Sequence, residues 1–263
     1  MFNKSSNPIF TIISLLFVVF LSISISACSY FNSSVKESPI FDPEASLQKA
    51  NELIKEGYYE AAREILETIK AKDATQKYSI IAKLRIADSY YEDELYEEAV
   101  TEYENFLSIH QHHKLAPYAQ YKLAMSFFKR IKTVDVSYSL AQKALNEFKK
   151  LRQQYPRNPY MDITENRIKM CKRVLAEHEF YVGQFYFKKG SYEAALNRLN
   201  EMIQTYPDSK KESEALYYIA ISHENLGNRD KAINTLNALI EKFPTIELSG
   251  KAKKLIASFN KKK

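Results

Sequence analysis

Small side chains recur along the chain from residue 42 onward, and a larger group follows each of them three residues later on the same helical face. The interval between small positions is 37 residues in three of four cases. A second alanine comes twelve residues after the small position in four units and twenty residues after it in the third, which indicates an eight-residue insertion there. This spacing predicts pairs of packed amphipathic helices. The small positions are Ala50, Ala87, Ala124, Gly183 and Ala220, and the second alanines are Ala62, Ala99, Ala144, Ala195 and Ala232.

Glycines stand between the two halves of three units, at Gly57, Gly190 and Gly227, where a tight turn between helices needs a left-handed residue. The repeat is that of the tetratricopeptide (TPR) motif. We therefore expect an all-α fold, an α-solenoid of five TPR helix hairpins with a C-terminal capping helix after Pro244. The stretch 161–189 has no proline, which predicts one unusually long helix at the start of the fourth unit.

The N-terminus has the layout of a secretory signal peptide, with a basic start and then an uncharged, mainly apolar run at Ile9–Ile25. The run ends in Ile25-Ser26-Ala27-Cys28, which resembles a bacterial lipobox, where cleavage precedes a cysteine that receives S-diacylglycerol and an N-acyl chain. We expect residues 1–27 to be a lipoprotein signal peptide and residues 28–41 to be the lipidated Cys28 and a flexible tether. The alternative is an ordinary signal peptide followed by an accidental cysteine. Ser29 after the cysteine is typical of lipoproteins on the inner leaflet of a Gram-negative outer membrane, facing the periplasm.

Composition narrows the functional classes. The chain has 263 residues, 45% of them hydrophobic, which is enough to form a substantial core. It has only 5 glycines, which argues against glycine-rich phosphate-binding loops. Its formal charge of +6 is unevenly distributed along the chain. Residues 41–110 carry 8 basic and 16 acidic groups, whereas residues 111–263 carry 28 basic and 15 acidic groups. This division predicts two partner surfaces, an acidic one on repeats 1–2 (42–110) and a basic one on repeats 3–5 and the capping helix (111–263). The alternative is that the charge of the exposed repeat faces varies along the chain without a functional reason.

Candidate chemistry is sparse. His110, His112 and His113 form the one histidine cluster of the sequence, at the exit of a hairpin, where we expect a solvated loop and no metal site. Cys171 lies within a predicted helix and is expected to be a buried small hydrophobe. No cofactor motif or catalytic arrangement is apparent, so the sequence predicts a binding protein and not an enzyme. Export from the cytoplasm also makes nucleic acid an unsuitable partner.

A more specific resemblance lies in the fourth unit. The stretch from Arg173 to Arg198, RVLAEHEFYVGQFYFKKGSYEAALNR, and the following Tyr206-Pro207-Asp208-Ser209 resemble the BamD family, lipoproteins of the outer-membrane β-barrel assembly machinery. The lipobox, the tether and the five repeats agree with that family. Thr133-Val134-Asp135 departs from it, because relatives tend to carry Asp-Arg-Asp there, so a family role of the third-repeat loop is not carried over.

The resemblance implies a lipid-anchored scaffold without cofactors. It would bind the periplasmic (POTRA) domains of the insertase BamA through its later repeats, and unfolded outer-membrane proteins through its earlier ones, beside other lipoproteins of the machinery. Asn197 and Arg198 are the implied BamA contacts. For substrate binding the resemblance implies a region and not individual contacts. The tyrosines of this region are Tyr58, Tyr59, Tyr90, Tyr91 and Tyr96.

Two other functions stay open from the sequence. A different TPR lipoprotein adaptor, serving secretin or pilus assembly or a peptidoglycan-linked complex, would share the fold and the anchor. An accessory hydrolase would be the enzymatic alternative.

Overall fold

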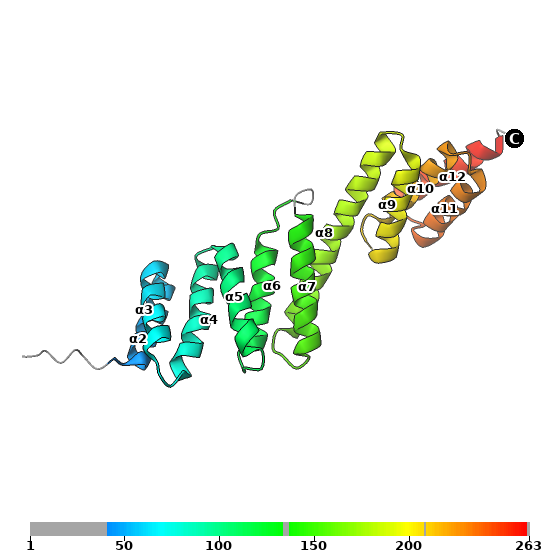
Figure 1. Ribbon diagram of the computed structural model, residues 1–263. Helices are drawn as coiled ribbons and strands as arrows, with labels where there is room; N and C mark the ends of the chain where they lie inside the picture. Colours follow the sequence, from blue (N-terminus) through cyan, green and yellow to red (C-terminus); the bar gives the residue numbers. More distant parts are fainter. Residues whose placement is uncertain (1–40, 134–136, 208, 262–263) are drawn as a thin grey trace, which may run out of the picture. The chain divides into compact units, whose positions relative to one another are not determined.

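The computed structural model describes residues 41–133, 137–207 and 209–261, and this part of the chain consists of eleven α-helices and connecting turns (Figure 1). Residues 43–263 form one compact unit. The predicted signal peptide, Cys28 and most of the tether lie outside the described residues. The helices are α2 (Pro43–Glu56), α3 (Tyr59–Lys72), α4 (Lys77–Glu92), α5 (Tyr96–His110), α6 (Ala116–Lys129), α7 (Tyr138–Gln154), α8 (Met161–Lys188), α9 (Tyr192–Thr205), α10 (Glu212–Asn225), α11 (Arg229–Lys242) and α12 (Glu247–Lys261).

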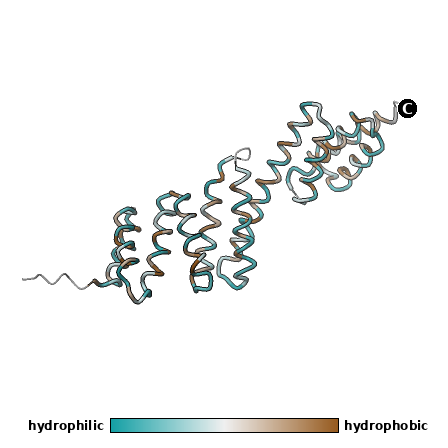
Figure 2. Tube along the Cα trace, viewed as in Figure 1, coloured by the Kyte–Doolittle hydropathy of each residue, from teal (hydrophilic) through white to brown (hydrophobic). Residues whose placement is uncertain are grey.

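Consecutive helices pack against one another in chain order, as α2–α3, α4–α5, α6–α7, α8–α9 and α10–α11 hairpins (Figure 1). The last helix, α12, packs against α11 and α10. Figure 2 shows hydrophobic and hydrophilic positions alternating along each helix, as expected for helices with one buried face. The predicted solenoid of five hairpins with a C-terminal capping helix is confirmed.

The recurring small residues lie where helices of neighbouring elements meet. All five are buried, and the four alanines among them are fully buried, as are all five second alanines. A small side chain lets two helix backbones approach closely, and large apolar groups fill the remaining space. Leu66, Tyr103, Phe148, Leu199 and Leu236, which follow the second alanines by four residues, are fully buried.

The long helix predicted for the fourth unit is confirmed as α8, which has 28 residues. Ile168, Cys171 and Leu175 of α8 belong to the core of the preceding hairpins, and the following Ala176 and Phe180 belong to the next core. Because Cys171 is fully buried, the prediction of a small core residue is confirmed, and burial raises the pKa of its thiol to about 12. A thiol with this pKa remains protonated near neutral pH and is therefore unreactive.

The eight-residue insertion of the third unit is divided between a connection and a helix. The α6–α7 connection spans residues 130–137, whereas the α4–α5 connection spans residues 93–95. In addition, α7 begins six residues before Ala144, while α5 begins three residues before Ala99. The register of the buried alanine is therefore kept although the turn is longer.

Four of the five turns between paired helices have left-handed backbone among the described residues, three of them at the predicted glycines. Gly57, Gly190 and Gly227 have φ angles of +85°, +76° and +75°. In the second hairpin the matching residue is Glu94, with φ of +60°. A side chain in this conformation is strained by roughly 1–2 kcal/mol, because its Cβ crowds the following carbonyl oxygen.

Replacing Glu94 with glycine should therefore stabilise the protein. We expect Glu94→Gly to raise the free energy of unfolding by about 0.5–1 kcal/mol, since the relief of strain exceeds the greater flexibility of glycine in the unfolded chain. Chemical denaturation of both proteins measures the difference. Gly190→Ala is the matched control and should destabilise; equal or lower stability of Glu94→Gly would show that the glutamate side chain stabilises the turn.

Candidate partner-binding surfaces

The five predicted substrate tyrosines lie in two groups on the first two hairpins. The first group surrounds Arg63, whose Nη1 lies 3.0 Å from Oδ2 of Asp93, in the turn of the next hairpin. The guanidinium of Arg63 also lies over the ring of Tyr90, 4.4 Å from its centroid. Tyr58 and Tyr59 line a cavity of about 400 Å³ beside this ion pair. Arg63 thus joins the first hairpin to the second.

Tyr91 and Tyr96 form the second group, with their rings in an edge-to-face arrangement 5.4 Å apart. Lys122 of α6 lies over Tyr91, with Nζ 3.4 Å from the ring centroid, and also pairs with Oε1 of Glu92 at 3.0 Å. Burial raises the pKa of Tyr91 to about 12. Since Tyr90, Tyr91 and Tyr96 are all partly buried, much of each ring serves packing.

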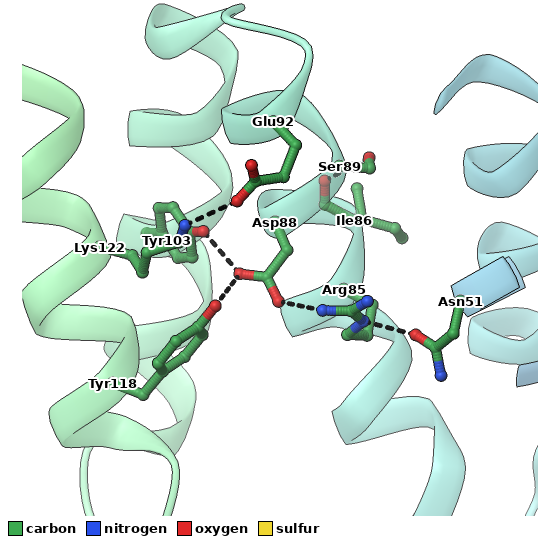
Figure 3. Close-up of polar contacts among 9 residues, drawn as sticks. All are labelled: Asn51, Arg85, Ile86, Asp88, Ser89, Glu92, Tyr103, Tyr118 and Lys122. Carbon is green, nitrogen blue, oxygen red and sulfur yellow. Dashed lines mark hydrogen bonds and ion pairs between the residues drawn. The ribbon is translucent and has the colours of Figure 1, made fainter. Parts of the chain in front are cut away.

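The second hairpin also contains a buried carboxylate that the repeat pattern does not reveal. Asp88 of α4 is 3% exposed and accepts hydrogen bonds from three side chains (Figure 3). The hydroxyls of Tyr103 (α5) and Tyr118 (α6) donate to its Oδ1 at 2.7 and 2.9 Å, and Nη1 of Arg85 donates to its Oδ2 at 2.8 Å. Nε of Arg85 donates in turn to Oδ1 of Asn51 in α2 at 2.7 Å.

This network connects helices of three successive hairpins through the ion pair of Asp88 with Arg85. Burial, and then the charge of Asp88, raises the pKa values of the Tyr103 and Tyr118 hydroxyls far above the usual value, so both remain donors. Hydrogen bonds to a buried charge are among the stronger ones, because water does not compete for them. The aspartate therefore restricts how the first three hairpins are placed relative to one another.

On the fourth hairpin, Asn197 and Arg198 both lie exposed near the middle of α9. Nη1 of Arg198 lies 3.3 Å from Oε2 of Glu179 in α8 and 4.0 Å from Oε2 of Glu201. The Arg198 side chain is 46% exposed, whereas that of Glu179 is 10% exposed. Glu179 thus orients the guanidinium, and the remaining donors of the planar group can reach a carboxylate of a partner.

Gly183 sets the distance between the helices that carry this ion pair. A Cβ atom on Gly183 would lie 2.5 Å from Cδ2 of Leu199 and 3.6 Å from Cβ of Arg198. An added Cβ would force the buried Leu199 side chain to shift, so the glycine favours the close contact of α8 with α9. The sequence signal for this contact was the glycine at a repeat position where the other units have alanine.

The histidine cluster differs from its prediction. His110 is the last residue of α5 and is partly buried, with its ring centroid 5.2 Å from that of Phe106, and burial lowers its pKa. His113 is also partly buried, and its Nδ1 accepts a hydrogen bond from the backbone N–H of Leu115 at 3.2 Å. The expectation of a solvated loop was wrong for these two residues, because they pack against Phe106; His112 is exposed.

The described residues offer neither a metal site nor a membrane span. No group of three or more His, Cys, Asp or Glu side chains among them could hold a metal ion. No helix in this part of the chain is sufficiently long and apolar to cross a membrane.

Stacked helix hairpins, glycine turns and a capping helix define the class of this protein: it is a TPR-type solenoid. The family model described as "YfiO: Outer membrane lipoprotein" matches residues 41–239, and the chain belongs to this family. The resemblance to the BamD family, first apparent in the fourth hairpin, is thereby confirmed.

Individual relatives agree with this assignment. The outer membrane protein assembly factor BamD of Neisseria gonorrhoeae is 25% identical over 226 residues, covering 81% of this chain and 84% of the relative. BamD of Vibrio cholerae is 25% identical over 195 residues, covering 70% of this chain and 81% of the relative. Among solved structures, the TPR2AB domain of yeast Sti1 in complex with pHSP90 matches with a TM-score of 0.45 at 16% identity, covering 83% of this chain and 86% of that one.

Removing the carboxylate of Asp88 should destabilise the first three hairpins. Asp88→Ala would leave two buried tyrosine hydroxyls and Arg85 without their acceptor, and we expect a loss of about 3 kcal/mol in the free energy of unfolding. Urea denaturation followed by circular dichroism measures it. Glu92→Ala, which removes the more exposed ion pair with Lys122, is the control and should change stability by less than about 1 kcal/mol. A small effect of Asp88→Ala would mean that apolar packing alone holds these hairpins.

The contact between α8 and α9 can be tested separately. Gly183→Ala should lower the free energy of unfolding by about 1–3 kcal/mol, because the added methyl group would overlap the buried Leu199 side chain. Gly250→Ala in α12 is the matched control, since a Cβ atom added there would have no neighbour within 4 Å and the φ of Gly250 is not positive. That variant should be neutral or more stable by up to about 1 kcal/mol. Thermal and chemical denaturation measure the stability of both variants. If Gly183→Ala were as stable as Gly250→Ala, the close contact at Gly183 would be contradicted.

Proposed function

We propose that this chain is a lipid-anchored scaffold of the outer-membrane β-barrel assembly machinery, which works by binding and not by catalysis. The observation that carries the proposal is family membership over residues 41–239, with relatives named as outer membrane protein assembly factors. A TPR solenoid suits this role, because it presents long faces to several partners at once. The anchor would be the lipidated Cys28, which would place the protein on the periplasmic face of the outer membrane, beside other lipoproteins of the machinery.

In this proposal the basic later hairpins bind the periplasmic POTRA domains of BamA. Arg198 would form a bidentate ion pair with a carboxylate of BamA, and Asn197 would add a hydrogen bond. The pair with the mostly buried Glu179 supports this role, because a guanidinium that is already oriented loses less side-chain freedom on binding. The acidic first two hairpins, with their tyrosines, would receive unfolded outer-membrane proteins.

The BamA contact can be tested by co-purification from detergent-solubilised envelopes. Arg198→Glu should reduce recovery of the BamA periplasmic domains at least about tenfold, because like charges would meet across the interface. Arg198→Gln, which does not repel Glu179, should also reduce recovery while the thermal midpoint and helical circular dichroism remain unchanged.

Arg152→Glu provides a matched control. Arg152 is 43% exposed and pairs with a carboxylate of Glu165 at 3.2 Å, much as Arg198 pairs with Glu179. This variant should leave BamA recovery unchanged. Unaltered recovery with both Arg198 variants would remove Arg198 from the interface, and recovery of a secretin or a peptidoglycan-linked protein in place of BamA would favour the adaptor alternative.

A further inference from the structure

The connection between α5 and α6 joins the acidic first two hairpins to the basic later ones, and its residues 111–115 include no acidic side chain. Two backbone hydrogen bonds pass through its histidines. The N–H of His113 donates to the carbonyl oxygen of His110 at 2.9 Å, and the N–H of Ala116 donates to the carbonyl oxygen of His113 at 2.8 Å. A third bond involves a ring, since Nδ1 of His113 accepts the backbone N–H of Leu115 at 3.2 Å. Two histidines therefore take part in holding this connection.

The bond to the His113 ring requires an unprotonated Nδ1. A ring nitrogen of histidine accepts a hydrogen bond through its lone pair, and both nitrogens become donors in the charged imidazolium. After protonation, the N–H of Leu115 would face a second N–H. Histidine ordinarily changes its charge between about pH 5 and pH 8. Acid in this range therefore acts directly on the hydrogen bond between His113 and Leu115.

His110 lies beside His113 in surroundings that also suit a neutral ring. Both rings pack against Phe106, with centroids 5.2 and 6.1 Å from it, and lie 6.5 Å from each other. Nε2 of His110 is buried and has no hydrogen-bond partner among the described residues. A proton at this nitrogen would have neither an acceptor nor water beside it, and an unpaired buried charge is costly.

The neighbouring charges add to this cost. Among the described residues, those that act on His110 are the positive charges of Lys83 in α4 and of His113 when it is protonated. The C-terminus of a helix ordinarily favours a charged histidine, but here burial, and then these two charges, lower the pKa of His110. Tyr155 donates its hydroxyl to the carbonyl oxygen of Gln111 at 2.8 Å and brings no charge, because burial raises its pKa.

We infer that the α5–α6 connection is an acid-sensitive joint, which is firm while His110 and His113 are neutral and loosens when both are protonated. Protonation would break the bond to Leu115 and place two like charges beside the Phe106 ring. Because the joint lies between the acidic and the basic hairpins, acid would weaken the connection between the two candidate partner surfaces. This property belongs to the fold and does not depend on which proteins those surfaces bind.

The sign of the pH effect is set by His110. Because the folded chain favours its neutral form, the folded state binds fewer protons than the unfolded state does. The stability that depends on this ring is fully present above the ordinary pKa of histidine, about 6.5. It is lost as the pH falls below that value toward the lower pKa of the folded state.

The first measurement is urea denaturation of the full chain in non-ionic detergent at about pH 7.5 and about pH 5.0. His110→Phe keeps an aromatic ring beside Phe106 but takes no proton. His113→Asn keeps an acceptor, since a side-chain oxygen of asparagine can accept the N–H two residues later. The unfolding equilibrium constant of the unaltered chain should rise on acidification. In the double variant this rise should be at least about threefold smaller.

His112→Asn is the matched control, because His112 is an exposed histidine of the same connection. It should retain the full acid sensitivity of the unaltered chain. The same pH dependence in the double variant and in the unaltered chain would overturn the joint, and so would an equal reduction in His112→Asn.

Hydrogen exchange tests the joint in the unaltered chain and therefore does not depend on whether a variant folds. Protection factors, which compare each amide with an unstructured chain at the same pH, should fall at least about fivefold from about pH 7.5 to about pH 5.0 at His113, Leu115 and Ala116.

The α3–α4 connection provides the internal reference. Oδ2 of Asp73 accepts the backbone N–H groups of Tyr78 and Ser79 at 2.6 and 2.9 Å. A hydrogen bond from the Thr75 side chain lowers the pKa of Asp73, so this carboxylate stays ionised in the same pH range and protection of the two amides should not change. Unchanged protection in the α5–α6 connection, or an equal loss in both connections, would contradict the inference.

Discussion

The close approach of the two helices in each hairpin is the constraint on which the rest of this structure depends. The residue at the contact is alanine or glycine in all five hairpins, and it is buried in each of them. Gly183 shows how narrow the space is, since a Cβ atom there would lie 2.5 Å from the Leu199 side chain. Once the helices are this close, the turn between them must be short, and that is why left-handed residues recur at the turns. The insertion of the third unit preserves the same contact, because Ala144 remains buried.

A polar interaction supplements this packing in the first three hairpins. Asp88 gathers Arg85, Tyr103 and Tyr118 from three helices, and Arg85 extends the network to Asn51. Because a buried carboxylate is tolerated only when its hydrogen bonds are made, the network permits few relative placements of these hairpins. The later hairpins are joined differently, through the continuous α8, whose earlier and later residues belong to successive apolar cores.

These two modes of coupling underlie the division of labour that we propose. The acidic hairpins are held by polar contacts and present tyrosines and exposed carboxylates. The basic hairpins present Arg198, oriented by Glu179, beside the close contact of Gly183 with Leu199. Arg198 is oriented by Glu179, and the rings of Tyr90 and Tyr91 contact Arg63 and Lys122, before a partner arrives, which reduces the entropy lost on binding.

The sequence by itself determined the repeat, the glycine turns, the long α8, the capping helix and the buried Cys171, because each depends on the spacing of residues along one or two helices. Tertiary structure alone decided which side chains from separate hairpins meet. Asp88 and Tyr118 lie 30 residues apart, and Glu179 and Arg198 lie 19 apart. Helical periodicity assigns a residue to a face, but the partner across that face depends on the offset between neighbouring helices. His110 and His113 were expected in solvent for the same reason. At the end of α5 both rings pack against Phe106, a contact that the spacing of residues does not predict.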